Sequence, residues 1–208
     1  DLVLGDLEAQ AGALWSVGVQ RTKDLLDIFG KEIVLEAFEM MGRSTEQRVK
    51  NAVSSWKDGA FEAETFVDDL ASPGEVIRLH VAAIKEGERL VMDFSGCGDQ
   101  SAGPINVRPS FVRGLVHYAV VAMIDPDIPH DFGLPAAIEC RFREGSILDP
   151  VFPGPTGFYS STVSILEGAV FDALATLSGR PMRGHNGSQG LVIMGNVGDQ
   201  SRRYVQFE

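Results

Sequence analysis

A change in hydrophobic period near residue 58 most constrains the fold of this 208-residue chain. Before this point, apolar residues recur every three or four positions, which is typical of amphipathic helices. After it, in "FEAETFVDD", apolar and polar residues alternate, which is typical of a strand with one buried face. We therefore expect a helical part over residues 5–57 and a mixed, β-rich part over residues 58–208.

The helical part is predicted to contain two segments. Residues 5–30 form the first helix in this prediction, with Gly30 as its stop. Apolar residues keep the helical period over the next segment, but Gly42 lies among them, and Ser44 with Gln47 matches a capping box. The second segment is therefore predicted either as one kinked helix or as two short helices.

The β-rich part is predicted to begin with an antiparallel meander over residues 60–94, in which the turn "KEGE" joins strands 76–84 and 89–94. Helices and strands do not alternate as βαβ units, so the predicted fold class is α+β. Because glycines and prolines concentrate in the second half, we expect extended, polyproline-like connections there. The later predicted elements are a helix at 110–124, a loop "DPDIPHDFGLP", strands "AAIECRF" and "GSILDP", a loop "VFPGPTGFYS", a helix at 161–178, a loop "GHNGSQG" and a hairpin of 190–196 and 202–207.

Charge and composition exclude several classes of protein. A net charge of -11 opposes nucleic-acid binding and an anionic membrane surface, and no run approaches the roughly 20 apolar residues of a membrane span. Cys97 and Cys140 form no CxxC pair, so we interpret them as reduced thiols of a cytosolic, cytoplasmic protein. The chain starts at Asp1 and stops at Glu208 inside a predicted strand, so we expect a segment of a longer polypeptide.

The stretch "DFSGCGDQSAGPIN", residues 93–106, gives the strongest local signal for a site. Its glycines would let a ligand or another backbone approach closely, because they lack Cβ atoms. An alternative is purely structural, with Asx turns and a glycine corner that close a strand, and composition alone favours this alternative. The side-chain oxygens and amides of the stretch belong to Asp93, Ser95, Asp99, Gln100 and Asn106.

A second signal is "GDLEAQ", where Asp6 and Gln10 are spaced i, i+4 and share one helix face. We expect Asp6 to lie near the helix start, where a negative charge is favourable. The simpler interpretation is a capping acid and a solvated glutamine.

The four histidines differ in how strongly their positions indicate a functional role. We expect His80 to lie on a strand surface and His117 to pack on a helix. His130 and His185 lie in the polar loops "PHDFG" and "GHNGSQG", where functional histidines are more common, although ordinary loop histidines remain the simpler interpretation. Standard phosphate-loop, zinc-protease and serine-hydrolase motifs are absent from the sequence.

Taken together, several stretches resemble the hydantoinase B family, which includes B-type subunits of N-methylhydantoinase and oxoprolinase and related subunits of acetone and acetophenone carboxylases. The matching stretches occur in the family's order over essentially the whole chain. Two departures are "HDFG", where the family more often has Asn before the glycine, and Cys97, where Thr is more usual. The stretches are "GDLEAQ", "GVQRTKDLLDIFG", "EQRV", "DGAFEAETFVDD", "LVMDFSGCGDQSAGPIN", the "IP…GLP" loop and "EGSILDPVFPGP".

The resemblance implies a central portion of a larger subunit that acts in a hetero-oligomer with an A-type subunit. That partner would bind and hydrolyse ATP with Mg²⁺, and a possible divalent metal would bind outside this segment, so no metal ligand is assigned within it. The resemblance implies that loop 93–106 lines a chamber or a subunit contact. The candidate catalytic residues are Asp93, Gln100, Asn106 and His130, and the candidate substrate-binding residues are Asp6, Gln10 and Ser95.

Three functions follow from the resemblance. The first is a B-type subunit of an ATP-dependent amidohydrolase that opens a cyclic amide such as a hydantoin or oxoproline. The second is a subunit of an ATP-dependent carboxylase of acetone or acetophenone type, with a ketone as its small-molecule substrate. The third is a non-catalytic scaffold segment of such a complex, because no complete set of nucleophile, base and orienting group is visible in the sequence.

Overall fold

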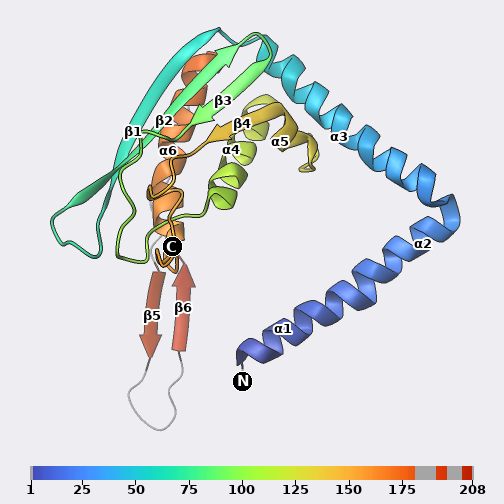
Figure 1. Ribbon diagram of the computed structural model, residues 1–208, viewed down its shortest axis with the longest axis horizontal. Helices are drawn as coiled ribbons and strands as arrows, with labels where there is room; N and C mark the ends of the chain where they lie inside the picture. Colours follow the sequence, from blue (N-terminus) through green and yellow to red (C-terminus); the bar gives the residue numbers. More distant parts are fainter. Residues whose placement is uncertain (1, 181–190, 196–202, 208) are drawn as a thin grey trace. The chain divides into compact units, whose positions relative to one another are not determined.

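A computed structural model describes residues 2–180, 191–195 and 203–207 of the chain. The chain divides into two compact units, a helical unit of residues 1–44 and a sheet unit of residues 45–208. Each unit is described by itself below, with the element labels of Figure 1.

The helical unit begins with α1 (Leu2–Ala13), the π-helical stretch η1 (Leu14–Val19) and α2 (Gln20–Phe29). Gly30 ends α2 with a φ of 83°, and its N–H donates to the carbonyl of Leu26. These elements confirm the predicted first helix and its stop. Because α1 begins at Leu2, Asp6 lies beyond the first turn, so its expected position beside the positive end of the helix dipole is wrong.

Helix α3 (Lys31–Ser54) is one continuous helix, and its last residues belong to the sheet unit. The alternative of two short helices with a capping box at Ser44 is therefore wrong. A glycine costs only about 1 kcal/mol inside a helix, and Gly42 is buried within α3. The turns that follow bury Thr45, Val49 and Val53, and this packing favours an uninterrupted helix.

The main sheet has the strand order β1-β2-β3-β4 (Figure 1). The first three strands pair antiparallel, as the meander predicts, and β4 pairs parallel to β3 from Leu90 with Ile138 to Asp93 with Arg141. A parallel pair needs a crossover connection, and α4 and α5 lie in that connection. The strands are β1 (Gly59–Asp68), β2 (Val76–Glu86), β3 (Arg89–Asp93) and β4 (Ile138–Arg141), and the helices are α4 (Pro109–Ile124), α5 (Gly133–Ala137) and α6 (Tyr159–Ser178).

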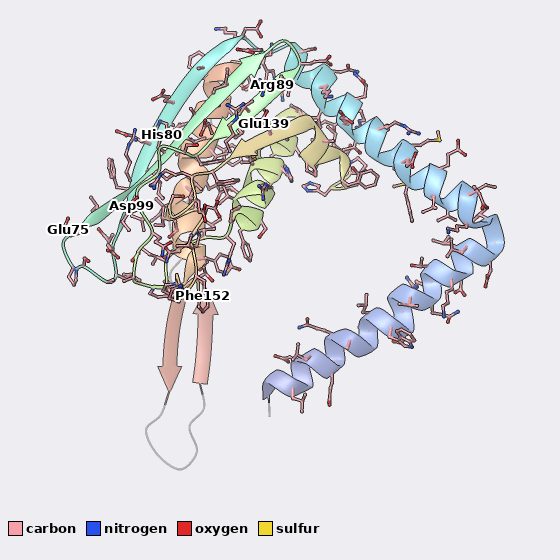
Figure 2. The ribbon with its side chains drawn as sticks, viewed as in Figure 1. Glu75, His80, Arg89, Asp99, Glu139 and Phe152 are labelled. Carbon is pink, nitrogen blue, oxygen red and sulfur yellow. The ribbon has the colours of Figure 1, made fainter. Side chains whose placement is uncertain are left out.

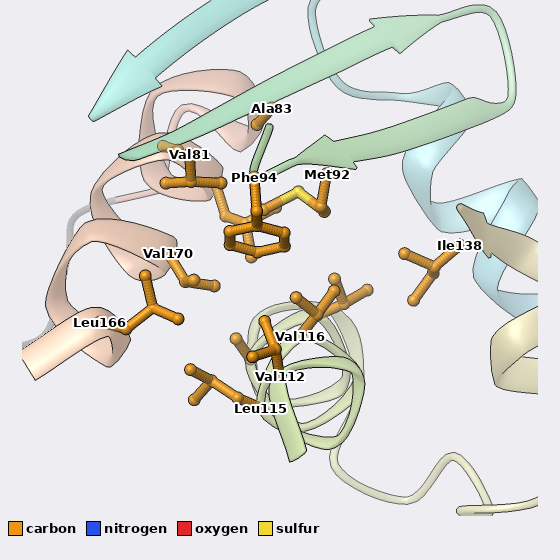
Figure 3. Close-up of a cluster of buried hydrophobic side chains, with 14 of the residues drawn as sticks. Val81, Ala83, Met92, Phe94, Val112, Leu115, Val116, Ile138, Leu166 and Val170 are labelled. Atoms are coloured by element: carbon orange, nitrogen blue, oxygen red, sulfur yellow. The ribbon is translucent and has the colours of Figure 1, made fainter. Parts of the chain in front are cut away.

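The core of the sheet unit lies between the sheet and helices α4 and α6, which cover the same face of the sheet (Figure 1). Figure 3 shows apolar side chains of β2 and β3 meeting those of the two helices around the ring of Phe94, which is fully buried. The alternation in the strands and the helical period in α4 and α6 thus supply two matching apolar surfaces. The labelled residues are Val81, Ala83, Met92, Phe94, Val112, Leu115, Val116, Ile138, Leu166 and Val170.

Three later predictions need correction or lie outside the described residues. The stretch "GSILDP" forms isolated bridges rather than a strand, because Gly145 has a φ of 78° and the chain turns back between Ser146 and Asp149. Helix α5 occupies the end of the predicted loop "DPDIPHDFGLP". The loop "GHNGSQG" lies outside the described residues, whereas the predicted hairpin is confirmed as the antiparallel strands β5 (Leu191–Gly195) and β6 (Arg203–Phe207).

Among the residues that the structure describes, no helix has both the length and the apolar character needed to cross a membrane.

Candidate functional site

The candidate site is the loop that follows β3 and leads to α4, residues 93–108. Asp93 ends β3 and is half-buried, and its Oδ1 accepts a hydrogen bond of 2.8 Å from the backbone N–H of Ser95. This local bond is an Asx turn, in which a short acidic side chain fixes the backbone two residues ahead. Ser95 itself is exposed, so the loop begins at the protein surface.

The glycines of the loop serve close packing onto β2 and the β1–β2 turn. A Cβ atom at Gly96 would lie 2.5 Å from Nδ1 of His80, and one at Gly98 would lie 2.7 Å from Cγ2 of Ile77. A Cβ atom at Gly103 would lie 3.1 Å from the backbone nitrogen of Ala71. The sequence signal for close approach was therefore correct, and the partner within this chain is its own sheet.

His80 is buried, so the prediction of a surface histidine is wrong. The strand alternation correctly places the His80 side chain on the face of β2 opposite to that of Leu79 and Val81. Loop 93–108, however, folds back over the face that carries His80. The backbone N–H of His80 donates to Sγ of Cys97, and the Cys97 thiol donates to the His80 carbonyl, each at 3.2 Å. The His80 ring Nε2 lies 3.2 Å from Oε2 of Glu62, and burial raises the pKa of the Cys97 thiol.

Asn106 is the central polar residue of the loop and is fully buried. Its Oδ1 accepts from the N–H of Ser101 at 2.8 Å, while its Nδ2 donates to the carbonyls of Ser101 at 2.9 Å and Gly103 at 3.1 Å. The same Nδ2 donates to the carbonyl of Pro155 at 2.8 Å. All polar atoms of this side chain are therefore satisfied inside the chain, which holds two loops together.

Gln100 makes a second link to the same neighbouring loop, residues 150–158. Its Oε1 accepts from the N–H of Val151 at 2.8 Å, and its Nε2 donates to the carbonyl of Val151 at 3.4 Å. A third link joins the Ser101 hydroxyl to the Asp69 carboxylate, and this hydrogen bond is the main cause that lowers the pKa of Asp69. The loop is therefore bonded on both sides, to the β1–β2 turn and to residues 150–158.

Asp99 is the most solvent-accessible acid of the loop. Its Oδ1 lies 2.8 Å from the Arg143 guanidinium, and the Asp99 side chain is 88% exposed. The same guanidinium donates to the Cys97 carbonyl at 2.8 Å. Figure 2 labels Asp99 of this loop and His80 of β2, both in the sheet unit.

His130 lies in a different loop, between α4 and α5, and is exposed. No hydrogen bond or ion pair among the described residues joins it to Asp93, Gln100 or Asn106. Burial lowers the pKa of His117 on α4, and the charges of His130 and Arg113 lower it further. His130 therefore shares no direct bond with the other three candidate catalytic residues in the part of the chain that the structure describes.

The loop that carries His130 is fixed to the end of α3. Arg48 and Asp125 form an ion pair of 2.6 Å, and the Thr45 hydroxyl donates to Oδ2 of Asp131 at 2.9 Å. Both contacts lie within the sheet unit. The loop is thus held in place at Asp125 and Asp131, and His130, which lies between them in the sequence, is exposed to solvent.

Asp6 and Gln10 lie on α1 in the helical unit, and both are exposed. Their i, i+4 spacing on one helix is confirmed, so they share one face. His185, the other candidate loop histidine, lies outside the described residues.

Lys85 is a charged residue that the sequence pattern did not single out, and it is only 2% exposed. Its Nζ donates to the carbonyl of Trp56 at 2.7 Å and lies 2.8 Å from Oδ1 of Asp58, so it stabilises the C-terminal end of α3. A lysine on the apolar side of the strand alternation, at the start of the predicted turn "KEGE", was the available signal.

The described part of the chain offers no geometry for a metal site. Among residues 2–180 and the two described strands that follow, no three His, Cys, Asp or Glu side chains converge on a point that could hold a metal ion. What the loop can do is orient a neighbouring group through Asp93, Ser95 and exposed backbone.

Comparison with known proteins connects this geometry to a family. The chain is 26% identical to the B-type subunit of a putative D-/L-hydantoinase from Pseudomonas sp. strain NS671, over 98% of this chain and 36% of that protein. It is 25% identical to the acetophenone carboxylase delta subunit of Aromatoleum aromaticum, over 84% of this chain and 27% of the relative. The chain thus spans about a third of the length of these curated relatives.

A solved structure shares the fold. The crystal structure of ATP-dependent caprolactamase from Pseudomonas jessenii superposes with a TM-score of 0.73 at 21% identity, over 84% of this chain and 30% of that chain. The family profile described as hydantoinase B/oxoprolinase matches residues 1–208. The chain therefore belongs to the hydantoinase B/oxoprolinase family.

Proposed function

We propose that the chain is part of a B-type subunit of an ATP-dependent amidohydrolase that opens a cyclic amide. The observation that carries this proposal is the family match over residues 1–208. It is supported by the similarity to the B-type subunit of a hydantoinase and to a caprolactamase described as ATP-dependent. Hydantoins, oxoproline and caprolactam all contain a ring amide, so a cyclic amide is the substrate class that these names share.

The proposed partner is an A-type subunit that binds ATP with Mg²⁺. An amide carbonyl is a poor electrophile, and phosphorylation of its oxygen by ATP would make the carbon susceptible to attack by water. The residues of the present chain would contribute by shaping and orienting the reaction space, because positioning alone can supply a large part of a rate enhancement.

Within that reaction space we assign different roles to the candidate residues. The internal hydrogen bonds of Asn106 and Gln100 support an architectural role, in which these amides keep loop 93–108 rigid. Asp93 is half-buried at the start of the loop and remains our candidate for orienting substrate. His130, Ser95, Asp6 and Gln10 are exposed and remain secondary candidates for contact with substrate or with another part of the complex.

Two alternatives have a specific observation in their favour. The similarity to an acetophenone carboxylase subunit supports a carboxylase that acts on a ketone. The satisfied polar groups of Asn106 support a scaffold role, because a side chain with every polar atom bonded inside the fold has none left for substrate.

The decisive experiment measures ATP turnover by the complex of this chain with the A-type subunit. Hydantoin, oxoproline and caprolactam would be compared with acetone and acetophenone, each with and without bicarbonate. The proposal predicts ATP hydrolysis coupled to ring opening without bicarbonate. A strict bicarbonate requirement together with ketone consumption would instead establish the carboxylase.

A matched pair of variants separates catalysis from scaffolding. Asp93→Asn keeps the size and hydrogen-bonding capacity of the side chain but removes its charge, so it should lower turnover at least about tenfold while the complex still assembles. Asn106→Ala should instead lower the stability of the chain. If Asp93→Asn turns over at the wild-type rate, the loop is a scaffold only.

A further inference from the structure

Asp93 lies on the face of the main sheet that is turned away from helices α4 and α6. In β2, Leu79, Val81 and Ala83 belong to the core cluster, so Ala82 points to the opposite face of the sheet. Asp93 and Ala82 are partners in the register of β2 and β3, and directly paired residues share a face. The carboxylate of our candidate for orienting substrate therefore lies on this opposite side, which we call the outer face.

Arg141 is the neighbour of Asp93 on the outer face. The two residues are partners in the parallel register of β3 and β4, and neighbouring strands lie about 4.8 Å apart. Within the part of the chain that the structure describes, no ion pair joins their side chains, because Arg141 pairs with Glu139 instead. The Arg141 side chain is 42% exposed. A carboxylate and an accessible guanidinium thus lie on adjacent strands without neutralising each other.

Glu139 holds the guanidinium of Arg141 through one nitrogen. Nε of Arg141 donates to Oε1 of Glu139 at 2.7 Å, and Oε2 of Glu139 accepts from Nη2 of Arg89 at 2.6 Å. Figure 2 labels Glu139 and Arg89 of this trio. The hydrogen bond that Arg141 makes within the described part of the chain uses Nε, so its two Nη groups remain for another acceptor. A guanidinium binds carboxylates and phosphates through such pairs of nitrogen donors.

A ligand that matches Asp93 and Arg141 together has a hydrogen-bond donor beside an anionic group. Oδ1 of Asp93 accepts from the N–H of Ser95, and its carboxylate has further acceptor sites for the N–H of a ring amide. In oxoproline, the carbon that carries the carboxylate is bonded directly to the ring nitrogen. The carbonyl carbon, whose oxygen ATP would phosphorylate, is bonded to the same nitrogen. Both positions place negative oxygens close to the group that Asp93 would orient.

We propose that Arg141 binds an anionic oxygen group of the reacting cyclic amide, next to the ring nitrogen that Asp93 orients. This inference rests on the proposed function and adds a substrate-binding residue to it. The anionic group has two possible sources, the carboxylate of a substrate of the oxoproline type and the phosphoryl group on the activated amide oxygen. The first source would make Arg141 select substrates that carry a carboxylate, whereas the second would make it act on every cyclic amide.

The test compares Arg141→Gln with Arg89→Gln in the complex of the full chain with the A-type subunit. Each change removes one guanidinium from Glu139, but Arg89 lies four positions before Asp93 on β3, about 13 Å away. Ring opening is measured with oxoproline and with pyrrolidinone, which is the same ring without a carboxylate. Arg141→Gln should raise KM for oxoproline about tenfold or more, because hydrogen bonds to charged groups commonly contribute this much. Arg89→Gln should keep the wild-type KM.

The two ring amides distinguish the two sources of negative charge. A rise in KM for oxoproline without one for pyrrolidinone identifies the substrate carboxylate, and an equal fall in kcat/KM for both identifies the phosphoryl group. Wild-type kinetics in Arg141→Gln, or the same loss in Arg89→Gln, overturns the proposal and leaves Arg141 as a surface ion-pair partner. If Arg141→Gln melts at a lower temperature than wild type, Arg141→Lys decides, because it keeps the charge but loses the paired donors.

Calorimetric binding of oxoproline without ATP separates failure of this inference from failure of the proposed function. If the wild-type complex binds oxoproline, Arg141→Gln does not, and no ring is opened, the proposed function fails while the binding role of Arg141 holds. If the wild-type complex opens a cyclic amide and Arg141→Gln does so with the same kcat and KM, the function holds and the role of Arg141 fails.

Discussion

The two units of the chain use apolar residues in different ways. The sheet unit buries them in one cluster between its sheet and helices α4 and α6. In the helical unit, Val34 is the buried apolar residue with a large side chain among those described, while most others are exposed. The exposed ones are Leu4, Leu7, Leu14, Trp15, Val17, Leu25, Ile28, Phe29, Ile33, Leu35, Phe38, Met40 and Met41.

This difference teaches that a helical period predicts a helix without saying what stabilises it. Most helical stability in proteins comes from packing of an apolar face rather than from intrinsic propensity. The sheet unit contains its own packing surfaces, so its substitutions should affect folding strongly. Substitutions in the helical unit should leave the unfolding of the sheet unit almost unchanged.

The largest effect is expected for Phe94→Ala. Phe94 is fully buried, and its ring stacks on Phe142 at a centroid distance of 5.5 Å. Removal of the ring should lower the free energy of unfolding of the sheet unit by about 3–5 kcal/mol, measured by urea denaturation. Phe66→Ala is the control, because Phe66 is 51% exposed on β1. A loss below about 1 kcal/mol at Phe94 would contradict the packed core.

A smaller loss is expected for Asn106→Ala. The change leaves the Ser101 N–H and the carbonyls of Ser101 and Gly103 without their partner inside the fold, so we expect about 2–3 kcal/mol of destabilisation by the same denaturation assay. Gln100→Ala is the comparison, since Gln100 is half-buried and water can replace part of its bonds. Equal stability of wild type and Asn106→Ala would show that the two loops are not held by this side chain.

The sequence predicted the parts of this fold that depend on local pattern. The three-stranded meander, the stop at Gly30, the helix predicted at 110–124 and the final hairpin all follow from period and turn residues. The continuous α3 was missed because packing of the helix after Gly42 outweighed the local cost of the glycine.

The local sequence pattern could not predict the hydrogen-bond partners of the candidate site residues. Gln100 bonds to Val151, and Asn106 bonds to Pro155, each about fifty positions later in the chain. His80 is buried by a loop that no strand alternation could place over it. The composition of loop 93–106 therefore indicated a constrained loop correctly, while the structure had to supply what constrains it.

His117 should make stability depend on pH. Burial, with the nearby charges of His130 and Arg113, lowers the pKa of this ring in the folded chain, so the unfolded chain binds the proton more readily. Folding stability should therefore fall as pH drops below the ordinary histidine value of about 6.5. Replacement His117→Leu should reduce the fall in melting temperature between about pH 7 and about pH 5, the interval in which an ordinary histidine titrates.

Wild type provides the reference for this measurement, since carboxylates titrate at lower pH and affect wild type and variant alike. An unchanged pH dependence in His117→Leu would show that the ring is more accessible to water than its position on α4 indicates.

The smallest effect is expected for Trp15→Ala in the helical unit. Trp15 is 72% exposed within η1, so little buried area is lost on truncation, and alanine is the better helix former. The free energy of unfolding of the sheet unit should change by less than about 0.5 kcal/mol. A loss near 2 kcal/mol, comparable with that of Asn106→Ala, would mean that Trp15 is packed in the isolated chain and that the two units do not differ as described. A negligible loss leaves the exposed apolar residues of the helical unit available to contact other parts of a larger assembly, and the unit would then gain its packing only there.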